Sequence, residues 1–202
     1  PLMNNTEDGF VAPSTEEYND SNNYLARASQ LPVQYDSRTK GYVTSVKYQG
    51  GLGTCWAYAA TAAMESYALS HGIVSSATDI DLDEYALAYM TFDDTQYVDK
   101  LGNSTGDVTT IKASSSMEKC LKGGGNDNYA FKTLSKWASM VNQQAGHEGI
   151  YLPTDYTFNV DDVEYILVGQ KYIKMTDTQD VKQAVIDNGA VTVSYNADTK
   201  YY

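Results

Sequence analysis

The chain has 202 residues, of which 42% are hydrophobic, so it is long enough to bury a sizeable core. Its net charge of -12 and its lack of long basic runs argue against nucleic acid or an anionic membrane surface as a partner. It has no transmembrane-length apolar segment and no recognisable signal peptide, and its two cysteines cannot build a disulfide framework.

The first predicted elements are an N-terminal arm and a long helix. Residues 1–30 are polar and turn-rich with little periodicity, which favours an extended arm or a residual pro-segment or linker. A helix is predicted from about Thr54, a plausible N-cap, to Ser70, with Gly72 as its stop. Small and apolar residues lie on nearly every side of this helix, so we expect it to be buried.

The remainder of the chain changes from helical to strand-like patterns. Helices are predicted over residues 83–90 and 129–141, with a surface loop over 93–125 between them. From residue 163 onward the pattern predicts strands over 163–168, 171–175 and 190–195, and a helix over 178–188 that Gly189 ends. This order predicts a helical lobe over residues 31–155 and the start of a β lobe, incomplete in this chain, over residues 156–202.

Cys55 is the most informative residue, because a glycine-rich turn places it at the start of an alanine-rich helix. The partial positive charge of a helix N-terminus favours a thiolate, which is the nucleophilic form of cysteine. Gln49, six residues upstream, offers an amide donor that could stabilise the oxyanion of an acyl intermediate. The structural alternatives are a buried cysteine that only packs and a glutamine that only completes a turn.

Around Cys55 the sequence resembles the papain family of cysteine peptidases, and further blocks follow in the family's order. Leu52 replaces the first cysteine of the family's Cys-Gly-small-Cys motif and Thr54 replaces its small residue, while Ala190 stands where the family has proline. Losing the first cysteine removes a disulfide partner and no catalytic group. The matching blocks are 31–38, 43–49, 49–58, 81–85, 123–125 and 182–194.

The resemblance implies an α+β, papain-like two-lobe fold, with a helical left lobe around the Cys-bearing helix and the start of an antiparallel β right lobe. It implies an endopeptidase that hydrolyses peptide bonds of proteins or peptides, with Cys55 as nucleophile and Gln49 as oxyanion donor. Gly124 and Gly125 would line the non-primed side of the cleft, and Ser194 would contribute to the second specificity pocket. No cofactor and no metal are expected.

The catalytic histidine and the asparagine that orients it are missing from their expected places after residue 180. His71 ends the predicted helix and His147 lies in a loop, so neither is expected to be the catalyst. We therefore expect both groups on a C-terminal segment of the same precursor, which is either separated by proteolytic processing of a zymogen or simply absent. An inactive papain-fold surface module that binds a partner, and acyl transfer to an amine, are the alternatives.

The Leu52 variant and the diverged middle of the chain look most like bacterial secreted or cell-surface members of the family, including clostridial cell-wall cysteine proteases. That resemblance implies a secreted or cell-wall-associated protein. Composition alone fits the cytoplasm equally well.

Overall fold

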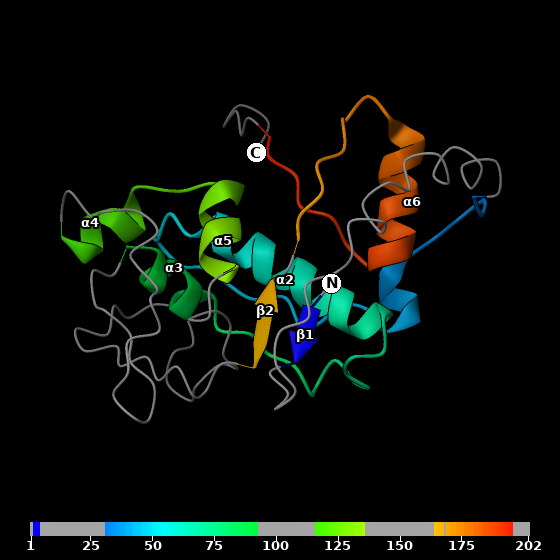
Figure 1. Cartoon of the computed structure of the whole chain (residues 1–202), viewed down its shortest axis with the longest axis horizontal. Coiled ribbons are helices and arrows are strands. Elements are labelled where there is room, and N and C mark those ends of the chain that lie inside the picture. The colour runs from blue at the N-terminus through cyan, green and yellow to red at the C-terminus, as the bar shows by residue number, and fades with distance from the viewer. Residues whose placement is uncertain (1, 5–30, 93–115, 136–163, 168, 196–202) are drawn as a thin grey trace.

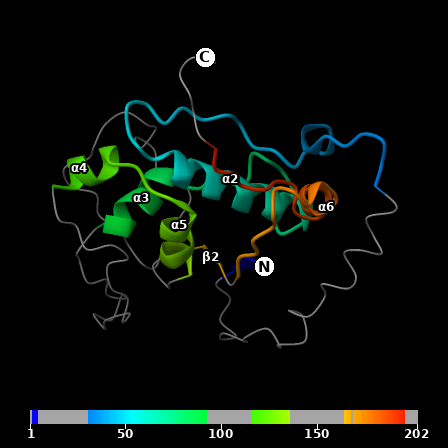
Figure 2. The ribbon, with the colours of Figure 1, turned by 90° about the horizontal axis from the view of Figure 1, so that it is seen from above.

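The structure, a computed structural model, describes residues 2–4, 31–92, 116–135, 164–167 and 169–195, and it is mainly helical. The long helix α2 lies in the middle, with α3, α4 and α5 around one end and α6 at the other (Figures 1 and 2). In chain order the elements are β1 Leu2–Asn4, the 3₁₀ helix η3 Ser37–Lys40, α2 Cys55–Ser70, α3 Glu84–Phe92, α4 Met117–Lys122, α5 Asp127–Leu134, β2 Tyr165–Leu167 and α6 Thr178–Asn188.

Helix α2 confirms the predicted helix almost residue for residue, and its C-terminus shows why it stops. Gly72 adopts a left-handed φ of 66°, and the Ile73 N–H donates back to the Ala68 carbonyl at 2.9 Å. At the other end Thr54 holds the N-cap position, but its side chain makes no capping hydrogen bond. The ψ of Thr54 is 13° and not extended, so Thr54 occupies the predicted N-cap position without the side-chain hydrogen bond that usually goes with it.

The expectation that α2 is buried on nearly every side is only partly right. Ala57, Met64 and Ala68 are buried against neighbouring elements, whereas Cys55 and Ala59 are exposed. The exposed positions recur at intervals of about four residues, as one face of a helix does. Among the described residues, α3, α5, α6 and β1 pack against α2, and they leave this face uncovered.

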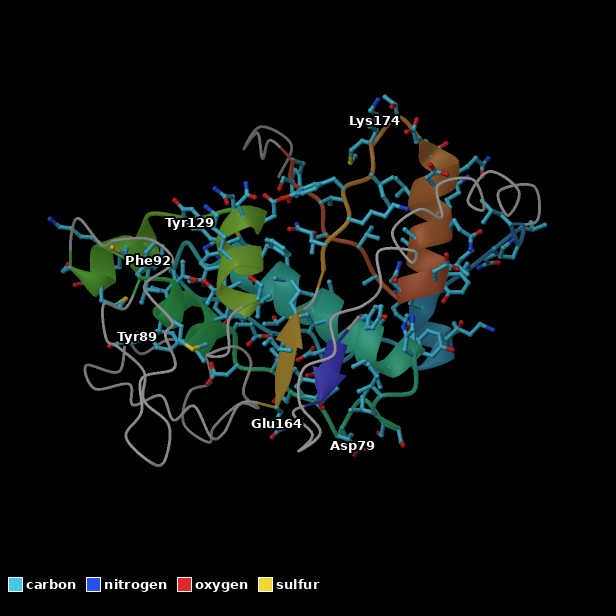
Figure 3. All side chains as sticks on the ribbon, viewed as in Figure 1. Asp79, Tyr89, Phe92, Tyr129, Glu164 and Lys174 are labelled. Atoms are coloured by element: carbon cyan, nitrogen blue, oxygen red, sulfur yellow. The ribbon has the colours of Figure 1, made fainter. Side chains whose placement is uncertain are left out.

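The core lies where α2 meets α3 and α5. Helix α3 extends the predicted 83–90 helix to Phe92, and Asp83 caps it by accepting a hydrogen bond from the Ala86 N–H at 2.8 Å. Phe92 and Tyr129 meet edge to face across α3 and α5, with ring centroids 5.9 Å apart, and Figure 3 shows the two side chains close together. The largest fully buried apolar side chains are Ile80, Leu82, Leu87, Leu121 and Leu134.

Two predictions in the middle of the chain are corrected. Helix α5 begins two residues earlier than predicted, because the Asn126 side chain accepts a hydrogen bond from the Tyr129 N–H, and it ends at Leu134. Residues 136–141 of the predicted helix lie outside the described residues. The predicted loop contains the short helix α4, which buries only Leu121 and therefore shows no helical periodicity in the sequence.

The strand predictions are mostly wrong. Only the first is confirmed, as β2, which pairs antiparallel with β1 through Leu2 opposite Leu167 and Met3 opposite Ile166. Residues 171–175 and 190–195 are described and form no strand. A strand requires a paired neighbour, and none of the described residues supplies one to either segment.

Helix α6 is confirmed with the predicted bounds, and Gly189 ends it. Gly189 has a φ of 80°, and a Cβ there would lie 2.6 Å from the Ser66 carbonyl oxygen of α2. The Ser37 hydroxyl donates to the Gly189 carbonyl at 2.5 Å, so η3, α2 and the end of α6 meet at this point. From there residues 190–195 run back over α2 toward its N-terminal half (Figures 1 and 2).

Candidate active site

Cys55 is the first residue of α2, and its side chain is exposed. The thiol therefore lies at the surface and at a helix N-terminus, after the glycine-rich turn, as the sequence predicts. Backbone N–H groups of a first helical turn have no intrahelical acceptor, so they point outward beside such a thiol. The arrangement suits a nucleophile that must be accessible and close to backbone donors.

Gly124 and Gly125, which were predicted to line the cleft, lie against the residues on either side of Cys55. Gly124 lies against Gly53, and Gly125 lies against Trp56. The Gly53 N–H donates to the Leu121 carbonyl at 2.8 Å, and a Cβ on Gly53 would lie 2.5 Å from the Gly124 nitrogen. The backbone of segment 121–125 is therefore packed beside the Cys55 turn, although sequence separates the two by about seventy residues.

Trp56 forms the other contact with this segment. Its indole is 7% exposed and meets the Tyr129 ring edge to face at 5.9 Å. A Cβ on Gly125 would lie 2.3 Å from the Trp56 Nε1 atom, so only glycine fits against the ring. Trp56 is thus a packing residue that fixes the glycine segment beside Cys55.

Gln49 is held by the turn that leads to Cys55. Its Nε2 amide donates a hydrogen bond to the Leu52 carbonyl at 2.7 Å. An amide nitrogen carries two hydrogens, so the bond to Leu52 uses one of them. Gln49 therefore lies next to the Cys55 turn. Among the described residues there is no hydrogen bond between the Gln49 side chain and the Cys55 thiol.

Ser194 is exposed, and among the described residues no hydrogen bond joins its side chain to the Cys55 turn. Its segment crosses α2 after Gly189, on the way toward the end of the helix that carries Cys55 (Figure 2). Among the described residues the structure therefore brings Cys55, Gln49, Gly124 and Gly125 together, and it shows no hydrogen bond from Ser194 to any of them.

His71 lies at the opposite end of α2 from Cys55. The helix spans 16 residues, so the separation is about 24 Å at 1.5 Å per residue. The His71 ring stacks on Tyr67 with centroids 3.8 Å apart, and its Nδ1 lies 3.0 Å from the Tyr67 carbonyl oxygen. This geometry excludes His71 as the base for Cys55, and His147 lies outside the described residues.

Sequence reasoning missed a partly buried ion cluster that joins the segment before Gln49 to α2 and α3. The Lys47 ammonium lies 2.5 Å from Asp81 Oδ1, 2.7 Å from Glu84 Oε1 and 3.3 Å from Glu65 Oε1, and it donates to the Leu82 carbonyl at 3.1 Å. The Glu65 side chain is 1% exposed. A glutamate inside the apolar pattern of α2, and a lysine two residues before Gln49, were the signals that could have revealed it.

The cluster changes the pKa of two of its members, Lys47 and Glu84. Burial alone would lower the pKa of Lys47, but the hydrogen bonds to Asp81 and Glu84 and the charge of Glu65 outweigh burial and raise the pKa. Burial raises the pKa of Glu84, although its contacts with Lys47 oppose the shift. Lys47 therefore stays positively charged at neutral pH, and its ammonium group lies in contact with three carboxylates.

The described residues contain no group of three or more His, Cys, Asp or Glu side chains arranged to hold a metal ion. Among the described helices, none combines the length and the apolar composition that a membrane crossing requires.

Comparison with known proteins supports the papain resemblance over part of the chain. Residues 31–87 match the model of the papain family cysteine proteases. The senescence-specific cysteine protease SAG39 of Oryza sativa subsp. indica is 38% identical over 78 residues, which cover 38% of this chain and 23% of that protein. Cathepsin S of Bos taurus is 54% identical over 37 residues, which cover 18% of this chain and 11% of that protein.

A third relative, cathepsin K of Mus musculus, is 38% identical over 58 residues, which cover 28% of this chain and 18% of that protein. The chain thus spans less than a quarter of the length of each of these relatives. No solved structure matches the chain. The family match over residues 31–87, with the described helices, confirms the predicted fold class: an α+β papain-like fold, of which the structure describes chiefly the helical left lobe around the Cys-bearing helix α2.

Proposed function

We propose that this chain is the N-terminal part of a papain-like cysteine endopeptidase that cleaves proteins or peptides through an acyl-enzyme on Cys55. The observation that carries the proposal is the exposed Cys55 thiol at the N-terminus of α2, with the glycine backbone of residues 123–125 packed beside it. Two of the relatives that match part of this chain are cysteine proteases by name.

In the proposed mechanism a histidine takes the proton of the Cys55 thiol, and the sulfur attacks the carbonyl carbon of the scissile peptide bond. The carbonyl oxygen becomes an oxyanion, which the Gln49 amide and the Cys55 backbone N–H stabilise. The tetrahedral intermediate collapses, the C–N bond breaks, and the histidine returns its proton to the leaving amine. Water then hydrolyses the thioester and regenerates the thiol.

Substrate would lie along the glycine segment. Gly124 and Gly125 carry no side chains that would cover their backbone groups, so an extended peptide could pair with them. Ser194 would form part of the second specificity pocket once residues 190–195 are completed by further β structure. No cofactor is needed for this chemistry.

The histidine and asparagine are proposed to reside on a C-terminal segment of the same precursor. Two observations support this: His71 is far from Cys55, and the chain spans less than a quarter of its relatives. By its Leu52 variant we place the protein with the bacterial secreted or cell-wall-associated members, including the clostridial type, and we expect synthesis as a zymogen. Residues 1–30 would be arm or pro-segment, 31–155 the helical lobe and 156–202 the start of the β lobe.

The test is turnover of an unfolded protein substrate by the complete protein. We expect Cys55→Ser to abolish peptide-bond cleavage, with a loss of at least about 10³-fold, because the attacking sulfur is removed. Cys120→Ser, the matched control at the other cysteine, should retain activity.

Two other outcomes would redirect the proposal. A complete protein that folds and binds a partner but cleaves nothing would identify an inactive papain-fold binding module. Products joined to an added amine would identify acyl transfer in place of hydrolysis, since both reactions pass through the same thioester.

A further inference from the structure

The loop over residues 43–48, which leads to Gln49, is attached to the described part of the helical lobe by polar side chains and not by backbone hydrogen bonds. Val46 is 98% exposed and Tyr48 is 76% exposed, so these side chains do not anchor the loop through burial. No backbone-to-backbone hydrogen bond between described residues involves residues 43–48. The position of this loop therefore depends on its polar side chains.

Two of those side chains reach the same carboxylate on α2. The Thr44 hydroxyl donates to Glu65 Oε2 at 2.5 Å, and the Lys47 ammonium lies 3.3 Å from Glu65 Oε1. Lys47 also donates to Glu84 of α3 at 2.7 Å. Glu65 Oε1 also accepts a hydrogen bond from the Leu82 N–H at 2.7 Å, so this carboxylate is held by the backbone as well as by the loop.

These contacts connect the helix that carries the nucleophile to the loop that leads to Gln49. From Glu65 on α2 the path runs through Lys47 to Gln49, two residues further along, and from the Gln49 amide to the Leu52 carbonyl at 2.7 Å. Leu52 lies three residues before Cys55, where α2 begins. The segment that carries Gln49 is therefore tied to α2 at one end through Lys47 and at the other through the turn before Cys55.

We propose that Lys47 is a positioning residue for oxyanion stabilisation: its ion pairs with Glu65 and Glu84 hold the Gln49-bearing loop so that the Gln49 amide faces the reacting carbonyl. The inference rests on the proposed function, because it assigns Gln49 to the oxyanion of the Cys55 reaction. Lys47 itself touches neither substrate nor sulfur.

The test compares a peptide aldehyde with the matching peptide alcohol as ligands of the complete protein. The Cys55 sulfur adds to the aldehyde carbon, and the proton lost by sulfur is transferred to the carbonyl oxygen, which lies where the oxyanion would form. The alcohol has no carbonyl, so the ratio of the two affinities reports oxyanion stabilisation separately from peptide binding. Alkylation of Cys55 by a peptidyl epoxide reports whether the thiol works at all.

We expect Lys47→Met to lower the aldehyde-to-alcohol affinity ratio about tenfold or more, since loss of one oxyanion donor costs on the order of 10²-fold. Gln49→Ala should lower the same ratio. In the Gln49→Ala background, Lys47→Met should change the ratio no further, because its effect passes through Gln49. Lys182→Met, at an exposed lysine of α6, is the matched control and should leave the ratio unchanged.

Glu84→Gln is the milder variant if Lys47→Met fails to fold, and it should lower the ratio in the same direction. A lower melting temperature with an unchanged ratio in Lys47→Met, or in Glu84→Gln when only that variant folds, would overturn the inference. A ratio that falls further when Lys47→Met is added to Gln49→Ala would overturn it as well. A wild-type protein that the epoxide does not label at Cys55 would instead refute the proposed function.

Discussion

Gly125 is the residue at which the packing of the site is tightest. A Cβ there would lie 2.3 Å from the Trp56 indole, and Trp56 is buried against Tyr129, so the ring has little room to move. We expect Gly125→Ala to lower the free energy of unfolding by about 1–3 kcal/mol through overpacking. Chemical denaturation of the complete protein measures this.

Gly51→Ala is the control for that prediction, because a Cβ on Gly51 meets no atom within 4 Å. Its effect should stay within about 0.5 kcal/mol, as for most surface substitutions. Equal effects of the two substitutions would show that the close contact between Gly125 and Trp56 is not what makes the position sensitive.

The buried charges predict how stability depends on pH. Burial raises the pKa of Glu84, so the folded state binds this proton more tightly than the unfolded state does. The contribution of Glu84 to stability is therefore fully present below its unfolded pKa and is lost as pH rises through the folded pKa. Relative to Glu84→Gln, the wild type should lose stability as pH rises from about 4 toward neutrality. Denaturation at several pH values checks this, and a difference that is constant with pH contradicts it.

The contribution of Lys47 to stability also falls as pH rises, but over a different pH range. Its pKa is raised in the folded state, so its stabilisation is present below the unfolded lysine pKa of about 10.4 and is lost only at higher pH. At neutral pH, Lys47→Met leaves Glu65 and Glu84 buried without their cation, which should cost about 3–5 kcal/mol. In chemical denaturation, a Lys182→Met control should cost less than about 0.5 kcal/mol. A similar cost for both lysines would contradict the cluster's role.

Helix α6 is docked on α2 through a glycine. Gly189 and Gly41 both have left-handed φ values, 80° and 75°, but only Gly189 faces a close neighbour, the Ser66 carbonyl. Gly41→Ala should therefore cost about 1 kcal/mol for backbone strain alone. Gly189→Ala should cost about 1–3 kcal/mol more, because the added methyl group pushes α6 away from α2. Equal costs in thermal denaturation would mean that the contact is not tight.

The elements that the sequence predicts well are those with local signals. Helices α2 and α6 were predicted within a residue, since their apolar or helix-favouring runs end at Gly72 and Gly189. The strands over 171–175 and 190–195 were wrong because strand formation depends on a partner, which a single segment does not reveal. Within the candidate site, Cys55 and Gln49 stand out in a local motif, whereas the glycine pair was predicted from the family resemblance. The Lys47 cluster was not predicted, because it joins residues up to 37 positions apart.

The described part of the molecule leaves several large apolar side chains in contact with solvent. Val46, Tyr48, Val193 and Tyr195 are all more than half exposed, and one face of α2 is exposed as well. A surface of this kind is typical of one that another part of the protein covers. We expect the isolated 202-residue chain to bind the dye ANS strongly, and the complete protein to bind it weakly, in fluorescence titration. Equal binding by both would contradict the proposed covering segment.

The most direct measurement is mass spectrometry of the complete protein, intact and as peptides, after treatment with an epoxide that alkylates papain-type thiols. Our account predicts one adduct per molecule, located on Cys55, with Cys120 unmodified, and a polypeptide that carries a histidine C-terminal to this chain. Labelling of Cys55 no faster than Cys120 in a folded protein would contradict the assignment of Cys55 as the catalytic nucleophile.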